Sequence, residues 1–179
     1  MEDARHSGFT LIELLVTLAL AAVLAGLAVP AMDHFVDNAR LRSAGESLAQ
    51  QLQFARSHAL TYQLPVYFSL SGSPGQWCFG WSDSADCDCN ATSPGPALCS
   101  TQGGNQNLIH RQLSTAFPAV QLNADDSVTL RSIRFSPIRG TASADSFSLR
   151  NDAGELRVIV SLLGRIRICA IDNPGYPSC

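Results

Sequence analysis

Gly8-Phe9-Thr10-Leu11-Ile12-Glu13 opens an apolar run that extends to about Met32 and contains one carboxylate, that of Glu13. At about 1.5 Å per residue, a helix over such a run of about 23 residues is long enough to span a bilayer. An ionised side chain within bilayer hydrocarbon costs several kcal/mol, so Glu13 needs a partner. If the chain is cut after Gly8, the new α-amino group of Phe9 is a cation one helical turn away, and it can pair with the Glu13 of a neighbouring copy.

The short polar leader followed by this run resembles the class III signal of type IV prepilins and type II secretion pseudopilins. The resemblance implies that a prepilin peptidase cuts after Gly8 and methylates Phe9. It also implies a leader at residues 1–8, a transmembrane and filament-core part of the N-terminal helix at residues 9–32, and a periplasmic pilin domain at residues 33–179. The expected location is the bacterial inner membrane, with a single pass, and then the pilus or cell surface.

An ordinary secretory signal or signal anchor is the alternative interpretation of the N-terminus. A secretory signal has a basic region before a short apolar core and a small-residue cleavage site after that core. Here Gly8 precedes the apolar run, and no Ala-x-Ala site follows it. The order of the parts therefore favours the prepilin interpretation.

Charge is distributed unevenly along the chain, whose net charge is −3. The segment from Ser127 to the end holds seven Arg and four acidic residues, whereas residues 81–126 hold five Asp and one Arg. The cationic residues are all Arg, because no Lys occurs. Guanidiniums favour planar, bidentate contacts with carboxylate or phosphate. A GC-rich genome is the alternative explanation of an Arg-only chain.

The six Cys indicate an oxidising compartment, which agrees with an exported domain. Cys169 and Cys179 bracket a tail without an apolar pattern, so a disulfide between them is predicted. The other four lie in a loop rich in Ser, Gly, Pro and Asp, and they suggest two more bridges in a crossed or a nested pairing, which the sequence leaves open. These four are Cys78, Cys87, Cys89 and Cys99.

Two metal sites are alternatives for this loop. A zinc cluster would use the same four thiolates, although such sites are commoner in reducing compartments. A calcium site would use oxygen ligands, although the loop lacks the Gly and the terminal Glu of an EF-hand. The oxygen-bearing candidates are Asp83, Asp86, Asp88 and Asn90. A solvated, disulfide-bonded loop without a metal or other cofactor is the interpretation that we favour.

Apolar residues recur at three- and four-residue spacing along residues 41–62, which predicts a helix that packs one face on a core. The stripe consists of Leu41, Ala44, Leu48, Leu52, Ala55, Ala59 and Tyr62. Pro65 marks the end of the helix. Strands are predicted at 66–70, 77–81, 119–122, 128–135, 146–150, 155–161 and 165–170. A long helix followed by short strands indicates an α+β fold, with the helix packed on antiparallel sheet.

The last two predicted strands form a hairpin whose register can be worked out from the apolar pattern. Apolar residues alternate in both strands, and both apolar sets must face the same core. A two-residue turn would place Val160 opposite Arg167, so the apolar side chains of one strand would share a face with the arginines of the other. A three-residue turn at 162–164 pairs Val160 with Ile166 and puts Gly164 where left-handed backbone is needed.

The same register places Arg157, Arg165 and Arg167 together on the outer face of the hairpin. Three neighbouring guanidiniums repel one another unless an anion or an acidic residue lies near. An anion-binding surface is therefore one interpretation. A solvated edge with Asp or Glu partners is the other.

The C-terminal half resembles the GspH/FimT family of minor pilins and pseudopilins. The resemblance covers most of the chain outside residues 71–126 and implies a type IV pilin-like fold. Within it, Gly164, Arg165 and Arg167 match the Gly-Arg-x-Arg motif of FimT-type minor pilins implicated in binding DNA during natural transformation. The stretches that carry the resemblance are 135–140 (FSPIRG), 147–149 (FSL), 157–161 (RVIVS) and 164–167 (GRIR).

Two functions are consistent with these features. The first is a minor pilin that binds double-stranded DNA, weakly and without sequence preference, through Gly164, Arg165 and Arg167 with support from Arg157. The alternative is a structural minor pilin or a GspH-like type II secretion pseudopilin that primes filament assembly without DNA. Other pilins, the prepilin peptidase and the inner membrane are expected partners in both. An enzyme is not expected, because no nucleophile motif is present and the histidines, including His34, His58 and His110, are scattered along the chain.

Overall fold

The computed structural model describes residues 9–85, 87–91, 98–103, 106–123, 128–171 and 175–179, and it describes side chains in these ranges except at 27–31, 102–107 and 128–130. Gly8, the rest of the predicted leader and the calcium candidate Asp86 lie outside the described residues. The chain divides into two compact units, Met1–Val36 and Asp37–Cys179, and helix α1 (Leu11–Tyr62) contributes to both.

Helix α1 begins with a capping arrangement in the first unit. The Thr10 hydroxyl accepts a hydrogen bond from the backbone N–H of Glu13 at 3.3 Å, and the Thr10 carbonyl accepts one from the N–H of Leu14. A Thr followed three residues later by a Glu is the sequence signature of such a helix start, and the helix dipole favours a carboxylate in the first turn. Glu13 therefore stabilises the helix N-terminus, a role that sequence reasoning missed although the signature was present.

The first unit exposes its apolar side chains. Every residue from Phe9 to Gly26 is exposed, including Leu11 at 79% and Leu24 at 68%. A continuous apolar surface of this kind marks a place of interaction. Within the described residues, no helical stretch combines the length and the hydropathy that crossing a membrane requires.

The C-terminal half of α1 packs one face on the core of the second unit. The six predicted stripe residues from Leu41 to Ala59 are completely buried, which confirms the predicted helical face. Tyr62 does not belong to it, because its side chain is 62% exposed and its ring lies 4.3 Å from that of His58 at the surface. The helix ends at Tyr62, before Pro65, because Gln63 adopts a φ of 55°.

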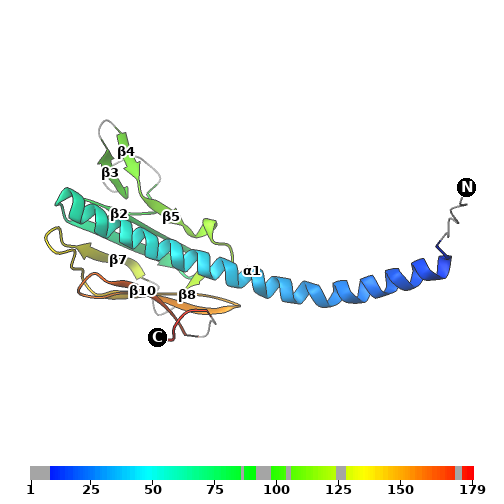
Figure 1. Ribbon diagram of the computed structural model, residues 1–179. Coiled ribbons are helices and arrows are strands. Elements are labelled where there is room, and N and C mark those ends of the chain that lie inside the picture. Colours follow the sequence, from blue (N-terminus) through cyan, green and yellow to red (C-terminus); the bar gives the residue numbers. More distant parts are fainter. Residues whose placement is uncertain (1–8, 86, 92–97, 104–105, 124–127, 172–174) are drawn as a thin grey trace, which may run out of the picture. The chain divides into compact units, whose positions relative to one another are not determined.

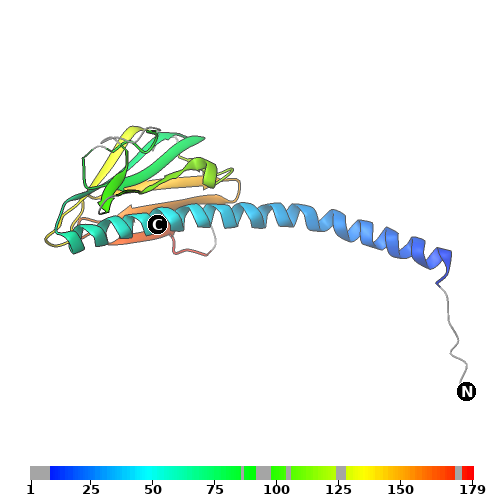
Figure 2. The same cartoon turned by 90° about the horizontal axis from the view of Figure 1, so that it is seen from above.

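Two four-stranded antiparallel sheets make up most of the second unit, and α1 runs along both of them (Figures 1 and 2). The first sheet has the strand order β5-β2-β1-β7 and the second has the order β10-β9-β8-β6. The first contains β1 (Val66–Ser73), β2 (Gln76–Ser82), β5 (Arg111–Leu113) and β7 (Val128–Phe135). The second contains β6 (Gln121–Leu122), β8 (Asp145–Asn151), β9 (Gly154–Val160) and β10 (Ile166–Ala170). The predicted α+β, type IV pilin-like fold is confirmed.

One hydrophobic core joins the helix to both sheets. Phe68 of β1 lies 5.9 Å from the ring of Phe79 and 6.2 Å from that of Phe147, which belongs to the second sheet. All three rings are completely buried, together with Leu48 and Leu52 of the helix. The side chains that alternate with these core residues point to the outer faces, where the site residues lie.

Three strands were not predicted. The hairpin of β3 (Ser100–Gly103) and β4 (Gln106–Ile109) and the short edge strand β5 lie in a segment whose polar residues gave no alternating pattern. A short 3₁₀ helix, η1 (Ser114–Ala116), follows them. Strand β6 is also shorter than predicted, because Ala119 has a φ of 66° and interrupts the extended backbone.

The register of the C-terminal hairpin agrees with the prediction. Ile166 pairs with Val160, and Ile168 pairs with Val158. Gly164 has a φ of 72°, as the three-residue turn requires. The turn is closed by hydrogen bonds from the Gly164 N–H to the Ser161 carbonyl at 2.8 Å and from the Ser161 N–H to the Arg165 carbonyl at 3.0 Å.

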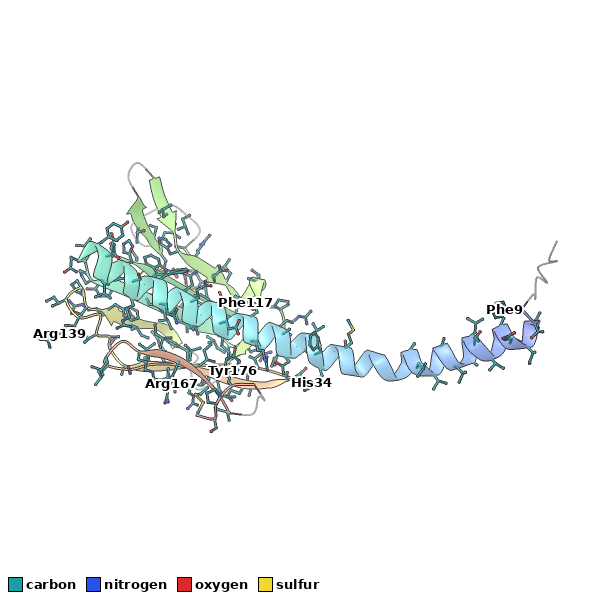
Figure 3. All side chains as sticks on the ribbon, viewed as in Figure 1. Phe9, His34, Phe117, Arg139, Arg167 and Tyr176 are labelled. Atoms are coloured by element: carbon teal, nitrogen blue, oxygen red, sulfur yellow. A yellow bond between two sulfur atoms is a disulfide. The ribbon has the colours of Figure 1, made fainter. Side chains whose placement is uncertain are left out.

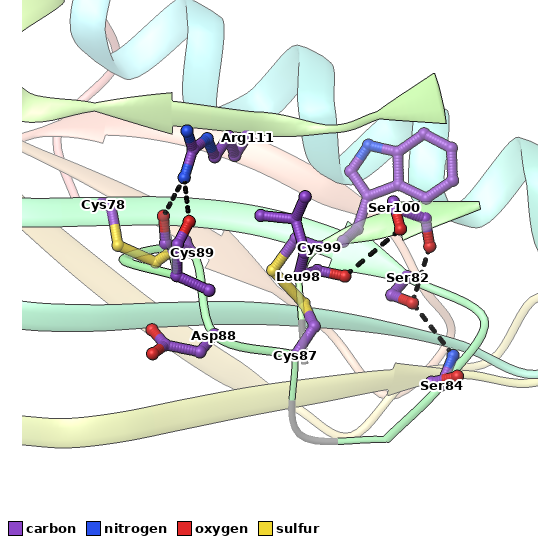
Figure 4. Close-up of a disulfide and its surroundings, with 12 residues drawn as sticks. Cys78, Ser82, Ser84, Cys87, Asp88, Cys89, Leu98, Cys99, Ser100 and Arg111 are labelled. Atoms are coloured by element: carbon purple, nitrogen blue, oxygen red, sulfur yellow. Dashed lines mark hydrogen bonds between the residues drawn. A yellow bond between two sulfur atoms is a disulfide. The ribbon is translucent and has the colours of Figure 1, made fainter. Parts of the chain in front are cut away.

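All six cysteines form disulfides. The predicted Cys169–Cys179 bridge is confirmed, and it ties the tail to β10. In the middle segment the pairing is crossed, Cys78 with Cys89 and Cys87 with Cys99, as Figure 4 shows in part. Because these sulfurs are bonded to one another, they hold no zinc. Of the calcium candidates, Asp88 instead accepts a hydrogen bond from the N–H of Asn90 at 2.8 Å.

Candidate nucleic-acid interface

The two arginines of the Gly-Arg-x-Arg stretch are free on the surface. Arg165 follows the β9–β10 turn, and Arg167 lies on β10 opposite Ile159; both side chains are exposed. Figure 3 shows Arg167 directed away from the core. Within the described part of the chain, neither guanidinium has an ion pair or a hydrogen bond. Their donors are therefore available to an anion.

Arg157 shares this outer face but is already engaged. Its Nε donates a hydrogen bond to the Ser148 hydroxyl at 3.0 Å, and its Nη2 lies 3.9 Å from the carboxylate of Glu155. The predicted group of three guanidiniums is thus two unpaired side chains and one with an acidic partner. The sequence pattern placed Arg157 on the right face, but it could not show which neighbours would bind it.

The β9–β10 turn is held by a residue that sequence reasoning missed. Arg56 of α1 donates from Nε to the Gly140 carbonyl at 3.0 Å and from Nη2 to the Leu163 carbonyl at 3.5 Å. The Ala142 N–H donates to the Leu162 carbonyl at 3.1 Å. The turn at 136–140 is therefore joined to the β9–β10 turn. An Arg near the end of an amphipathic helix gives no sequence signal of such a role.

The turn at 136–140 brings further cationic side chains to this end of the unit. Arg139 is exposed within it, and Figure 3 shows it at the end of the unit where α1 ends. Arg134 is exposed at the end of β7, where its backbone and Ser143 exchange hydrogen bonds of 3.0 and 3.2 Å. Apart from the charge asymmetry of the C-terminal half, the sequence gave no reason to single out these two residues.

Several other arginines are bound within the fold and are not part of this surface. Arg131 pairs with the Asp145 carboxylate and lies 4.8 Å from the Phe147 ring centre. Arg111 donates to backbone carbonyls of the stapled middle segment (Figure 4). Arg42 lies over the Tyr176 ring at 5.7 Å. A neutral substitution at Arg42 would therefore disturb the packing of the tail. A variant at this position cannot serve as a control that removes only a positive charge.

Two histidines come together elsewhere, in contrast to their scattered positions in the sequence. A groove of about 440 Å³ between α1 and the first sheet is lined by His58, His110 and Trp81, among others. The His110 ring stacks on the Trp81 ring with 3.7 Å between ring centroids, and the centroid of the His58 ring lies 5.1 Å from that of Trp81. Burial lowers the pKa of both histidines. A groove with neutral imidazoles and no guanidinium in its lining does not suit phosphate, so the cationic turns are the candidate site.

A family model described as "Type II transport protein GspH" matches residues 44–164, a range that contains the turn at 136–140 and ends at Gly164, directly before Arg165. This match covers more than half of the chain. The chain belongs to the GspH family. The resemblance to GspH/FimT minor pilins and pseudopilins is thereby confirmed. A second model, "Prokaryotic N-terminal methylation motif", matches residues 3–29 of this GspH-family chain.

One curated relative is named as a protein of a type II secretion system. The type II secretion system protein H of Xanthomonas campestris pv. campestris is 36% identical over 70 residues, which cover 39% of this chain and 41% of that protein. The matched stretch is thus less than half of the relative's length. Among solved structures, two crystal forms of the type IV minor pilin FimU of Pseudomonas aeruginosa are 17% identical to the GspH-family chain. The two structural alignments cover 75% and 72% of this chain and 91% of the FimU chain in each case, with TM-scores of 0.44 and 0.42.

Proposed function

We propose that this GspH-family chain is a minor pilin of a type IV pilus that binds double-stranded DNA during DNA uptake for natural transformation. The observation that carries the proposal is the pair of exposed guanidiniums of Arg165 and Arg167, which have no acidic partner among the described residues. Gly164 shapes the turn before them. Arg157 contributes less, since its guanidinium is shared with Glu155. The role is binding and structural, with no catalytic step and no cofactor.

Binding of this kind is weak and insensitive to sequence. Phosphate contacts position a protein on DNA but carry no base information, which is read in the grooves. A hairpin face offers no helix to enter a groove. With two to four phosphates neutralised, the logarithm of the association constant falls with the logarithm of salt concentration at a slope of about −2 to −4. Single strands are bound less well by a surface without exposed aromatic rings, because stacking dominates their recognition.

The proposal includes processing and membrane insertion at the N-terminus. A prepilin peptidase cuts after Gly8, Phe9 becomes the methylated N-terminus, and Glu13 pairs with the amine of a neighbouring pilin in the filament. Residues 9–32 anchor the chain in the inner membrane before assembly, and residues 33–179 lie in the periplasm. The match to the methylation motif supports this arrangement.

Mass spectrometry of the assembled protein tests the processing step. The expected N-terminus is a methylated Phe9, and an intact Met1 would contradict it. Glu13→Val should insert into the membrane but assemble poorly. Thr10 caps α1 through the backbone N–H of residue 13, a contact that a substitution there can keep. Glu13→Gln is the companion variant, because it removes the charge but keeps a polar side chain of the same length, so normal assembly of Glu13→Gln would contradict the pairing role.

A DNA titration tests the binding function. The full chain in a non-ionic detergent is mixed with a short duplex at several salt concentrations, and affinity is measured by fluorescence anisotropy. Arg165→Gln/Arg167→Gln should weaken binding strongly without loss of stability, because both side chains are exposed. Arg150→Gln is the control, since it removes an exposed guanidinium from the opposite end of the second sheet. Equal binding by the double variant and the wild type would refute the proposal.

A structural pseudopilin is the second candidate. The description of the family model and the name of the curated relative, both of which refer to type II secretion, favour it. In this case the protein primes filament assembly, and its arginines face other subunits. Absence of DNA binding by the wild type at low salt, together with a secretion defect in a deletion strain, would establish it in place of the first candidate.

A further inference from the structure

We propose that Arg134, at the end of β7, and Arg139, on the connection between β7 and β8, bind the same DNA as Arg165 and Arg167, so that two joined turns and the strand ends beside them form one phosphate-binding surface. The inference rests on the proposed function and extends it to two residues outside the Gly-Arg-x-Arg stretch. Arg56 acts as the positioning residue that holds the two turns together. The joined-turn surface is defined here by Arg134, Arg139, Arg165 and Arg167.

The two turns are joined through their backbones. The Ala142 N–H donates to the Leu162 carbonyl at 3.1 Å, and Ala142 also forms a bridge with Phe135. Arg56 binds one carbonyl from each turn, that of Gly140 and that of Leu163. These contacts place the backbone that carries Arg139 beside the backbone that leads into Arg165.

Two glycines make this close approach possible. Gly140 and Gly164 have φ values of 61° and 72°, which side chains rarely allow. A Cβ atom on Gly164 would overlap the Gly140 carbonyl. Since neither turn can shift without breaking these contacts, the backbone positions from which Arg139 and Arg165 extend are fixed relative to each other before any ligand binds. Such pre-organisation lowers the entropy cost of binding.

Among the described residues, no acidic side chain compensates the charge of the joined-turn surface. All four side chains are exposed, and among the described residues none has an ion pair. Two acidic residues of the described part of the second sheet are already paired, Asp145 with Arg131 and Glu155 with Arg157. Asp126 and Asp172, which are nearer in sequence to Arg134 and Arg167, lie outside the described residues. Neighbouring unpaired guanidiniums repel one another and gain most from a polyanion that meets several of them at once. The repeating phosphates of a nucleic acid fit this requirement.

The salt dependence of DNA binding measures how many phosphates the protein contacts. Each phosphate contact contributes about −0.9 to the slope of log affinity on log salt, so four contacts give a slope of about −3.6. The full chain in a non-ionic detergent is titrated with a short mixed-sequence duplex across a salt series. Arg134→Gln and Arg139→Gln should each make the slope shallower by about 0.9, as should Arg165→Gln and Arg167→Gln. Arg150→Gln should leave it unchanged. Circular dichroism and thermal unfolding check that each variant is folded.

The outcomes separate this inference from the function on which it rests. If the Arg165 and Arg167 variants lose affinity while Arg134→Gln and Arg139→Gln match the wild type, the two-turn surface is wrong and the proposed function stands. If the wild type does not bind duplex DNA at low salt, both are wrong. If Arg150→Gln weakens binding as much as Arg139→Gln, binding depends on net charge alone and the localised surface is refuted.

Discussion

The stapled segment (residues 83–109) and the C-terminal hairpin (residues 154–170) both lie on sheets of the second unit, but different forces hold them in place. In the hairpin, Leu156, Val158 and Val160 are at most 1% exposed and belong to the main core. In the stapled segment, Cys87, Cys89 and Cys99 form a separate buried cluster together with Cys78 of β2. Burial in register stabilises the hairpin, whereas covalent bonds hold the stapled segment.

This difference determines what each segment can do on its outer surface. The inner face of the hairpin supplies its stability, so its outer face can carry unpaired arginines at little cost. The stapled segment contains exposed apolar side chains at Leu108 and Ile109, which are 52% and 56% exposed, and it depends on its bridges. We therefore expect the hairpin to lose stability when a buried side chain is shortened, and the stapled segment to lose stability when a disulfide is removed.

The largest effect is expected from a cavity in the hairpin. Leu156 is completely buried beside Gly45 of the helix, and Leu156→Ala should lower the free energy of unfolding by about 2–5 kcal/mol. Leu108→Ala in the stapled segment should change it by less than about 0.5 kcal/mol, because Leu108 is exposed. Denaturant unfolding of both variants checks the contrast. Equal losses would mean that the stapled segment is packed as tightly as the hairpin.

The crossed disulfides should rank next. The Cys78–Cys89 and Cys87–Cys99 bridges span 11 and 12 residues, and loop entropy gives each about 3 kcal/mol. Cys78→Ala/Cys89→Ala should therefore lower stability by about 2–3 kcal/mol and raise amide hydrogen exchange in residues 83–109. Exchange in residues 154–170 should rise less than in the stapled segment, because only openings that unfold the whole unit expose it, and DNA binding of the folded variant should stay as in the wild type. Unchanged exchange in the stapled segment would show that contacts other than the bridge hold it.

The same contrast explains what could be predicted from the sequence. The hairpin register followed from the alternation of Val158 and Val160 with Ile166 and Ile168, since of the two- and three-residue turns only the three-residue turn places all four on the core side. The sequence predicted that the four middle cysteines form two disulfides, but it did not determine their pairing, because Cys87 and Cys89 are two residues apart and each can reach Cys78 or Cys99. The β3–β4 hairpin was missed, since the sequences of its strands, STQG and QNLI, have no apolar alternation.

At the candidate site, the sequence predicted which residues face outward but not which of them remain free. Arg165, Arg167 and Arg157 share a face because side chains alternate along strands. The engagement of Arg157 depends on Ser148 and Glu155, whose distances from it follow from the folded sheet. Contacts between turns far apart in sequence, such as those of Arg56, have no periodic signature and could only be seen in the structure.

A smaller effect is expected from the glycine that joins the turns. Gly164→Ala places a side chain at a φ of 72° and against the Gly140 carbonyl, so it should cost about 1–3 kcal/mol and separate the two turns. DNA affinity should fall although every arginine is retained. Gly75→Ala is the matched control, since a Cβ there meets open space. Wild-type affinity in a folded Gly164→Ala variant would show that binding does not need the joined turns.

The smallest effect concerns pH and the region beside the stapled segment. His110 follows β4, stacks on Trp81 and shares a hydrogen bond of 2.8 Å with the Thr101 hydroxyl. Burial lowers the pKa of His110, and the nearby His58 lowers it further. Burial also lowers the pKa of His58, an effect that Asp83 partly opposes. Both imidazoles therefore take up protons more readily in the unfolded chain.

The sign of the pH dependence follows from this difference. Above pH of about 6.5 both states hold these imidazoles neutral, and the stability is fully present. As pH falls below that value, the unfolded chain binds protons first, so the folded state loses stability. The melting temperature should fall by a few °C at most between pH 7 and pH 5, given about 2–4 °C per kcal/mol in a domain of this size.

His110→Phe keeps a ring on Trp81 and should reduce this pH dependence. Because the variant leaves the Thr101 hydroxyl without its hydrogen-bond partner, it should also be less stable than the wild type at every pH. A His110→Phe variant with the full pH dependence of the wild type would assign the effect to groups outside this region.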